Sequence, residues 1–386
     1  MTVLKTSLHI GIAGAGLAGR SLAWRLLRAG CRVSLFDARR RDDFATASMT
    51  AAAMLSPLAE LAVSDDAVFA LGQRSMQLWP RWIAELAEGG VERSAGPPQA
   101  SSAPSGGSVL HEVKSVGARS EPVYFKTEGT LVIAHAQDQP SLEHFTRLLH
   151  HKLPEACRAQ VQALDAQALA QKEPLLAGRF SGGLFLEGEG QLANDQLMAA
   201  LALEIDRLGG IWYEEQTVLQ MEEHRIVCAN KLHAVDVAVD ARGVGSKAQL
   251  PNLRGVRGEV LRVECRGAVL QRPVRLMHPR YQLYVAPRPN HEFVVGATEL
   301  ESEDDGPVTV RSVLELASAL HSLHPAFGEA RVLRMSAALR PALDDHRPAI
   351  ARRDGVWHIN GLYRHGYLCA PALVDALTHK LLAPQE

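Results

Sequence analysis

Three glycines near the start of the chain are spaced to bind a phosphate. Gly14, Gly16 and Gly19 follow a short apolar run, residues 9–13, and open a stretch with apolar residues at helical spacing. The first glycine permits a tight turn, the second lets the backbone approach a pyrophosphate, and the third lets the helix pack close to the strand. The N–H groups and positive dipole end of that helix favour an anion.

Asp37 supplies the second part of the same pattern. It follows the apolar run 32–36, at the place where a dinucleotide site has an acidic residue about 20 positions after the glycines. A carboxylate there accepts hydrogen bonds from ribose hydroxyls and repels a 2′-phosphate, which argues against NADP. A glycine turn alone would also suit a strand–helix connection without a ligand. The strand, helix, second strand and acid in register favour a bound dinucleotide.

The remaining elements predict an α/β fold. Strands and helices alternate at both ends of the chain, and strands dominate residues 256–297. We therefore expect a doubly wound, Rossmann-like domain that is discontinuous in sequence, together with a mixed α+β substrate domain. The nucleotide-binding domain is assigned to 1–90, part of 141–250 and 330–386; the substrate domain is assigned to part of 91–140 and 251–330.

Three segments carry more specific expectations. Residues 123–135 predict a β-hairpin that turns at Glu128-Gly129. The small residues of 45–60 are typical either of a helix interior or of a helix N-terminus packed against a planar ligand. The glycine-, proline- and serine-rich residues 96–108 predict a flexible insertion.

Composition excludes several classes of partner. The net charge is −2, so no overall field favours nucleic acid or an anionic membrane surface. No apolar run reaches the roughly 18 residues of a membrane-spanning helix. The five cysteines form no CxxC pair, which predicts neither a disulfide framework nor a metal site and favours the reducing cytoplasm. Nothing in the sequence decides between a monomer and a homo-oligomer.

Five segments in order carry a resemblance to one family. They are residues 14–37, ATASMTAAAMLSP (45–57), FVVGATE (293–299), SAALRPALDDHRPAI (336–350) and GLYRHGYLCAPAL (361–373). Together they resemble the FAD-dependent amine and amino-acid oxidases of the D-amino-acid oxidase superfamily. The likeness is strongest to glycine oxidases, including the type found in thiamine biosynthesis. It implies a glutathione-reductase-like FAD-binding domain that holds FAD tightly and without a covalent bond.

The resemblance also implies which residues contact the flavin nucleotide. They are Gly14, Ala15, Gly16, Leu17, Ala18, Gly19, Asp37, Ala38, Arg39, Ser48, Met49, Thr50, Ala52, Met54, Val218, Ala241, Gly243, Arg340, Gly361, Arg364, His365, Gly366, Tyr367 and Leu368.

The implied reaction oxidises a C–N bond of an amine or amino acid. A hydride passes from the α-carbon to flavin N5, the imine hydrolyses to an oxo acid and ammonia, and O₂ reoxidises the flavin to give hydrogen peroxide. Arg340 and Arg364 are candidates to bind the substrate carboxylate, because a guanidinium matches a carboxylate with two parallel hydrogen bonds. Arg340 is the first choice, and Tyr284 is a candidate to assist it.

Glu299 departs from the family pattern, which has an apolar residue such as Met after Gly-Ala-Thr. A carboxylate near the flavin would favour a cationic group, so a larger or basic amine is an alternative to glycine. A second function is a related dehydrogenase or modifying flavoprotein that acts on a macromolecule-bound amine, such as a tRNA wobble uridine. The near-neutral charge argues against tRNA. A third is a flavin-binding protein without oxidase turnover.

Overall fold

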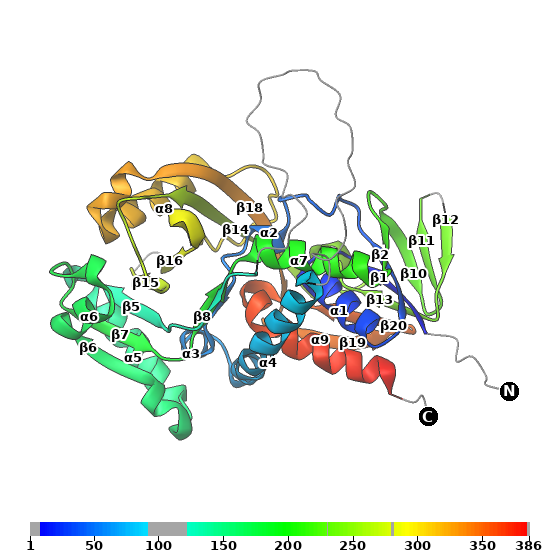
Figure 1. Ribbon diagram of the computed structural model, residues 1–386, viewed down its shortest axis with the longest axis horizontal. Coiled ribbons are helices and arrows are strands. Elements are labelled where there is room, and N and C mark those ends of the chain that lie inside the picture. The colour runs from blue at the N-terminus through cyan, green and yellow to red at the C-terminus, as the bar shows by residue number, and fades with distance from the viewer. Residues whose placement is uncertain (1–7, 92–121, 230, 279–281, 384–386) are drawn as a thin grey trace, which may run out of the picture.

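The computed structural model describes residues 8–91, 122–229, 231–278 and 282–383, and the predicted insertion at 96–108 lies outside them. These residues form two large sheets and two small ones. Figure 1 shows the first large sheet on the right and the second on the left, with the helices α4 (Asp66–Val91) and α9 (Gly366–Leu382) below. Among the described residues, no helix is both long and apolar enough to cross a bilayer.

The first large sheet is the predicted nucleotide-binding sheet. Its six strands, in spatial order, are β19 (Ala349–Arg353), β20 (Val356–Asn360), β13 (Val237–Asp240), β1 (His9–Ala13), β2 (Arg32–Phe36) and β9 (Ile211–Tyr213). β1 pairs in parallel with both β2 and β13, so a segment more than 200 residues away returns to the first strand. This is the discontinuous, Rossmann-like arrangement that the sequence predicts.

Helices cover one face of this sheet and a small sheet covers the other. Apolar side chains of α1 (Leu17–Arg28), α4, α7 (Asn194–Arg207) and α9 form one core with the central strands. On the opposite face, Ala13, Phe36 and Ala238 pack against residues of a three-stranded sheet. Its strands are β10 (Val218–Glu222), β11 (Arg225–Cys228) and β12 (Lys231–Ala234).

The second large sheet contains the strands within residues 253–296, which the sequence assigns to the substrate domain. Its eight strands, in spatial order, are β18 (Arg331–Leu343), β14 (Leu253–Glu264), β17 (Glu292–Gly296), β16 (Gln282–Pro287), β15 (Val274–Met277), β5 (Thr130–Ala134), β7 (Gly182–Leu186) and β6 (Val161–Asp165). Three helices pack with it: α8 (Val310–Leu323), α5 (Gln139–Lys152) and α6 (Ala166–Lys172). A three-stranded sheet of β3 (Met54–Leu55), β8 (Gly190–Leu192) and β4 (Phe125–Lys126) completes the fold.

Two sequence-based expectations differ from this structure. β18 was expected in the nucleotide-binding part, but it pairs with β14 along its length and lies in the eight-stranded sheet. The hairpin at 123–135 is wrong: β4 pairs with β8, while β5 pairs with β7 and β15, so every residue of β5 is buried between long-range partners. Local turn chemistry at Gly129 could not reveal those partners.

Residues 45–60 form no single helix. α2 (Ala47–Thr50) and α3 (Pro57–Leu61) flank β3, and Ala53 has a φ of +48°, which no helix contains. Of the two expectations for this segment, the short helix beside a ligand-sized space is the one that the geometry supports.

Two buried carboxyl groups should make the folded protein less stable as the pH rises. Burial raises the pKa of Glu189 from 4.5 to about 7, and that of Glu173 likewise. Between pH 4.5 and about pH 7 these carboxyls are deprotonated in the unfolded chain and still protonated in the folded chain. The free energy of unfolding therefore falls as the pH rises through this range. We expect Glu189→Gln to stabilise the protein above pH 7, on the order of 3 kcal/mol, and to bring little gain near pH 4.5.

Urea unfolding at pH 5 and pH 8 would measure this effect. The glutamine keeps an oxygen that can accept the N–H of Ala59, which lies 2.7 Å from the Glu189 carboxyl. Glu187→Gln makes the same chemical change two residues away at an exposed position and is the control. A gain of equal size at both pH values would show that Glu189 does not titrate in this range.

Candidate active site

The glycine turn lies at the carboxyl end of β1. Gly14 has a φ of +97°, and its N–H donates to the carbonyl oxygen of Phe36 at 2.7 Å. A Cβ added to Gly19 would lie 1.8 Å from the carbonyl oxygen of Gly14. The first helix therefore packs against the turn at a distance that no side chain allows, as the glycine pattern requires.

Asp37 lies beside the turn at the end of β2. One carboxylate oxygen accepts the N–H of Ala15 at 2.6 Å, and the other accepts the N–H of Arg39 at 2.9 Å. An ionised carboxylate has about four acceptor positions, so each oxygen can accept one more hydrogen bond. The residue thus stabilises the turn and can still bind ribose hydroxyls.

Arg20 also holds the turn, and no sequence motif predicts this role. Its side chain is 6% exposed, and its Nε donates to the carbonyl oxygen of Ala15 at 2.7 Å. Its two Nη atoms donate to the carbonyls of Met198 and Arg41. All of these acceptors are backbone atoms, which a sequence pattern does not identify.

A cavity of about 960 Å³ extends from this turn to the eight-stranded sheet. It is lined by most of the residues that the sequence singled out: Gly14, Gly16, Leu17, Ala18, Asp37, Ala38, Arg39, Ser48, Thr50, Ala52, Met54, Val218, Ala241, Gly243, Tyr284, Glu299, Arg340, Arg364, His365, Gly366, Tyr367 and Leu368. Ala15, Gly19, Met49 and Gly361 are not among the lining residues. Ala15 and Gly19 act through the turn, and Met49 packs on the core.

The segment 48–54 forms one side of the cavity with small side chains. The Oγ of Ser48 accepts the N–H of Leu17 at 2.8 Å, and its carbonyl accepts from the hydroxyl of Tyr367 at 2.8 Å. The buried Arg288 donates to the carbonyl of Ala52. These contacts fix the segment against both α1 and the eight-stranded sheet.

Arg340 lies at the other end of the cavity. Both of its Nη atoms donate to the carbonyl oxygen of Thr298 at 3.0 Å. Within the described residues, no ion pair joins Arg340 to a carboxylate. A half-buried guanidinium without such an ion pair is suited to bind an external carboxylate. Tyr284 of β16 lines the same cavity, and burial raises the pKa of its hydroxyl, so the phenol stays protonated.

Arg364 has a different environment from Arg340. Its Nε lies 3.0 Å from Oε2 of Glu60, and its Nη1 lies 3.2 Å from Oε2 of Glu299. Glu299 also accepts a hydrogen bond from the hydroxyl of Tyr363. The charge of Arg364 is therefore matched within the protein, which leaves Arg340 as the candidate carboxylate ligand.

Glu60 is the centre of this charge cluster and was not predicted. Its side chain is 13% exposed and contacts Arg275 at 3.3 Å, Arg364, and the Nδ1 of His365 at 3.1 Å. Burial alone would raise the pKa of this carboxyl, but Arg364, His365 and Arg275 outweigh it and hold the pKa well below its usual range. The pKa of Glu299 is lowered as well, since Tyr363 and Arg364 outweigh its burial. Both carboxyls are thus ionised at neutral pH.

Comparison with known proteins identifies the family of this chain. The model of a family described as FAD dependent oxidoreductase matches residues 9–379. The chain belongs to the FAD-dependent oxidoreductase family. FAD is accordingly its cofactor, and the chain is an oxidoreductase.

Relatives of this FAD-dependent oxidoreductase match over nearly its whole length. A Rhizobium etli protein that bears the name thiamine biosynthesis oxidoreductase ThiO is 35% identical over 378 residues, or 98% of each chain. The crystal structure of glycine oxidase from Geobacillus kaustophilus has a TM-score of 0.78 at 21% identity and covers 97% of this chain and 94% of its own. Iminodiacetate oxidase from Chelativorans sp. BNC1 has a TM-score of 0.75 at 20% identity and covers 97% and 95%. The two structures show the fold.

The residues of the cavity fit FAD. The pyrophosphate would lie at Gly16 and the N-terminus of α1, and the adenosine ribose at Asp37. The flavin would lie along segment 48–54, whose small side chains leave room for a planar ring. When bound, FAD accepts a hydride and thereby two electrons from a substrate.

Proposed function

We propose that this enzyme oxidises a small amino acid that carries one carboxylate, in the manner of a glycine oxidase, and that it does so in the cytoplasm. The observation that supports this proposal is Arg340, a guanidinium that forms no ion pair with any carboxylate of the described residues and that lies in a cavity continuous with the dinucleotide site. The name of the Geobacillus kaustophilus relative, glycine oxidase, points to the same substrate class. All five cysteines are free thiols, as expected of a protein in a reducing compartment.

The charges at this end of the cavity favour a single carboxylate. Glu60 and Glu299 pair with Arg275 and Arg364, whereas no carboxylate of the described residues forms an ion pair with Arg340, so we assign the substrate carboxylate to this guanidinium. Glu299 is already paired with Arg364, which supports an amino acid without a basic side chain over a basic amine. A substrate carboxylate on Arg340 would leave its amine and α-carbon to be oriented by the rest of the cavity.

The proposed reaction takes a hydride from the α-carbon, and the resulting imine then hydrolyses to an oxo acid and ammonia. Arg340 would bind and orient the carboxylate, with Tyr284 beside it as a neutral hydrogen-bond donor. O₂ would accept the electrons and become hydrogen peroxide. The amine must be neutral when the hydride leaves, since a positive charge on nitrogen opposes its departure.

Anaerobic titration of the purified holoenzyme tests the proposal. Glycine, sarcosine and a panel of D-amino acids are added while the visible flavin spectrum is recorded, with methylamine as the analogue of glycine that lacks a carboxylate. We expect one of the amino acids to bleach the flavin and methylamine to fail. Air should then restore the colour and produce peroxide. Bleaching without peroxide would indicate a dehydrogenase, and a spectrum that no amino acid bleaches would overturn the proposed substrate class.

A further inference from the structure

The strand β14 passes directly beneath the guanidinium of Arg340. Side chains alternate along a strand, so Arg257 and Glu259 lie on one face and Gly258 on the other. Gly258 lines the cavity, whereas Arg257 and Glu259 are 1% and 0% exposed on the far side. Gly258 therefore faces Arg340 on the cavity side, while Arg257 and Glu259 contact the residues behind it.

On the cavity side, the missing side chain of Gly258 makes room for Arg340. A Cβ added to Gly258 would lie 2.3 Å from Cζ and Nη2 of Arg340. The φ of Gly258 lies outside the left-handed region, so its backbone suits any residue. The glycine therefore leaves the space in which the guanidinium of Arg340 lies, and its role does not depend on a special backbone conformation.

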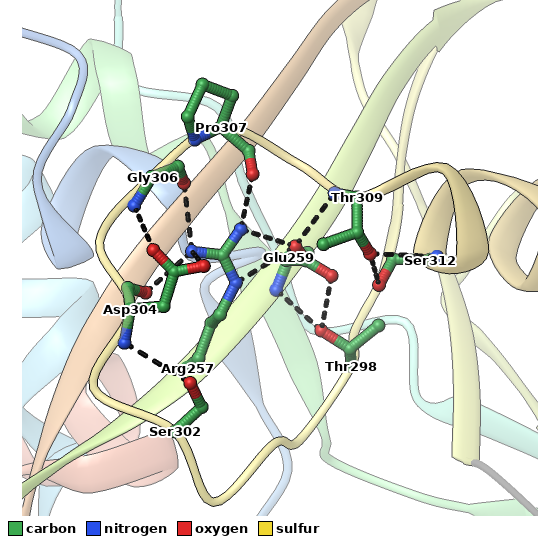
Figure 2. Close-up of polar contacts among 9 residues, drawn as sticks. All are labelled: Arg257, Glu259, Thr298, Ser302, Asp304, Gly306, Pro307, Thr309 and Ser312. Atoms are coloured by element: carbon green, nitrogen blue, oxygen red, sulfur yellow. Dashed lines mark hydrogen bonds and ion pairs between the residues drawn. The ribbon is translucent and has the colours of Figure 1, made fainter.

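On the far side, Arg257 holds the loop that joins β17 to α8. Its guanidinium donates to the carbonyl oxygens of Asp304 at 2.6 Å, Gly306 at 2.9 Å and Pro307 at 2.6 Å. Figure 2 shows these contacts. Its Nε and Nη2 also donate to Oε1 of Glu259, at 3.0 and 2.6 Å. The carboxylate of Asp304 lies 3.6 Å from the same guanidinium, so Arg257 ties the loop to β14 through both its backbone and a side chain.

Glu259 connects this cluster to Arg340 through Thr298. The N–H of Glu259 donates to Oγ1 of Thr298 at 2.9 Å, and that hydroxyl donates to Oε2 of Glu259 at 3.4 Å (Figure 2). The carbonyl of the same threonine accepts both Nη atoms of Arg340. Thr298 is 7% exposed, so this contact is shielded from water.

We propose that Arg257, Gly258 and Glu259 are positioning residues for Arg340, which they hold in the orientation that receives the substrate carboxylate. Gly258 bounds the guanidinium on one side. On another side the guanidinium donates to the Thr298 carbonyl, which Glu259 and Arg257 hold in place. A guanidinium fixed in advance loses less freedom on binding and presents its planar fork in one geometry. This inference rests on the proposed function, because it concerns the same carboxylate site.

Gly258→Ala is the first variant that tests the inference. The new methyl group must displace the end of the Arg340 side chain, and a displacement of about 1 Å can cost a hundredfold in activity. We expect the dissociation constant of the amino acid that bleaches the flavin to rise at least about tenfold. Gly255→Ala is the matched control on the same strand, because its Cβ would meet only the side chain of Leu339, at 3.2 to 3.5 Å.

Thr298→Val and Thr298→Ser form a second pair. Valine keeps the shape but loses the hydroxyl that bonds Glu259, whereas serine keeps the hydroxyl. We expect weaker amino-acid binding in the valine variant and recovery in the serine variant. Each variant is also combined with Arg340→Ala. If Gly258 and Thr298 act through Arg340, their substitutions should cause no further loss of amino-acid affinity once Arg340 is alanine. Additive losses of affinity would overturn the inference.

Crystal structures of the Gly258→Ala and Thr298→Val holoenzymes separate this inference from the proposed function. A guanidinium that keeps its place in both would overturn the positioning role, whatever the substrate. If no amino acid bleaches the wild-type flavin, the proposed function fails, and the position of Arg340 in these structures still decides whether the tripeptide holds it.

Discussion

Replacing Arg340 with alanine should weaken amino-acid binding by at least about 30-fold. The guanidinium is half-buried, and losing one member of a buried, hydrogen-bonded charge pair costs about 2–5 kcal/mol, where every 1.4 kcal/mol is tenfold. Arg340→Lys should recover only part of this loss, because an ammonium cannot form two parallel hydrogen bonds with a carboxylate. Anaerobic titration of the flavin with the reactive amino acid measures the dissociation constant for each variant.

Arg334→Ala is the control for this prediction. Arg334 lies on the same strand, β18, and is also half-buried, but it packs over the ring of Phe44 and does not line the main cavity. Its loss should leave amino-acid binding unchanged. If the two alanine variants bound the amino acid equally well, the carboxylate would be held by a residue other than Arg340.

The nucleotide end of the site could be predicted because its parts are close in sequence. The glycine turn, the first helix and Asp37 lie within one strand–helix–strand unit, and the contact between Ala15 and Asp37 spans only 22 residues. Local sterics and helix electrostatics determine such a unit almost alone. The return of β13 to the same sheet agrees with the discontinuous, Rossmann-like domain that the sequence predicts.

The substrate end could not be predicted in the same way. The contact of Glu60 with Arg275 spans 215 residues, and its contact with Arg364 spans 304. Which charges meet depends on how the eight-stranded sheet joins the first, and no local pattern encodes that. For this reason the sequence offers Arg364 as a second candidate beside Arg340, although Arg364 is paired with Glu60 and Glu299.

The failed hairpin has the same origin. Residues 125–134 have the composition of two short strands with a glycine between them, and turn chemistry favours pairing them locally. In the structure, β5 gains two buried neighbours and β4 joins a separate small sheet. Long-range burial outweighs a local turn preference because it removes a whole apolar strand from water.

Of the two carboxylates that pair with Arg364, Glu60 should cause the larger loss of stability when it is replaced by glutamine. Without this charge, Arg275 loses its ion pair and Arg364 keeps only Glu299. Breaking a buried ion pair by removing one partner costs about 3–5 kcal/mol, because it leaves an uncompensated charge in a poorly solvated place. Thermal and urea unfolding of the holoenzyme would measure the loss.

Glu299→Gln provides the matched comparison, since both carboxylates bind Arg364. The side chain of Glu299 is 48% exposed against 13% for Glu60, so water can replace much of what it contributes. We therefore expect a clearly smaller loss from Glu299→Gln. Equal losses would mean that burial does not set the strength of these pairs.

The pH dependence of stability shows whether Glu60 stabilises the fold through its charge or only through its shape. The pKa of Glu60 lies well below its usual range in the folded protein, so its stabilising effect is complete above the ordinary value of 4.5 and disappears as the pH falls through the lowered pKa. The difference in stability between wild type and Glu60→Gln should thus be constant from pH 6 to pH 8 and shrink in strong acid. A difference that persists unchanged in acid would show that glutamine fails at this position through its shape, and that the charge of Glu60 does not hold Arg275 and Arg364 in place.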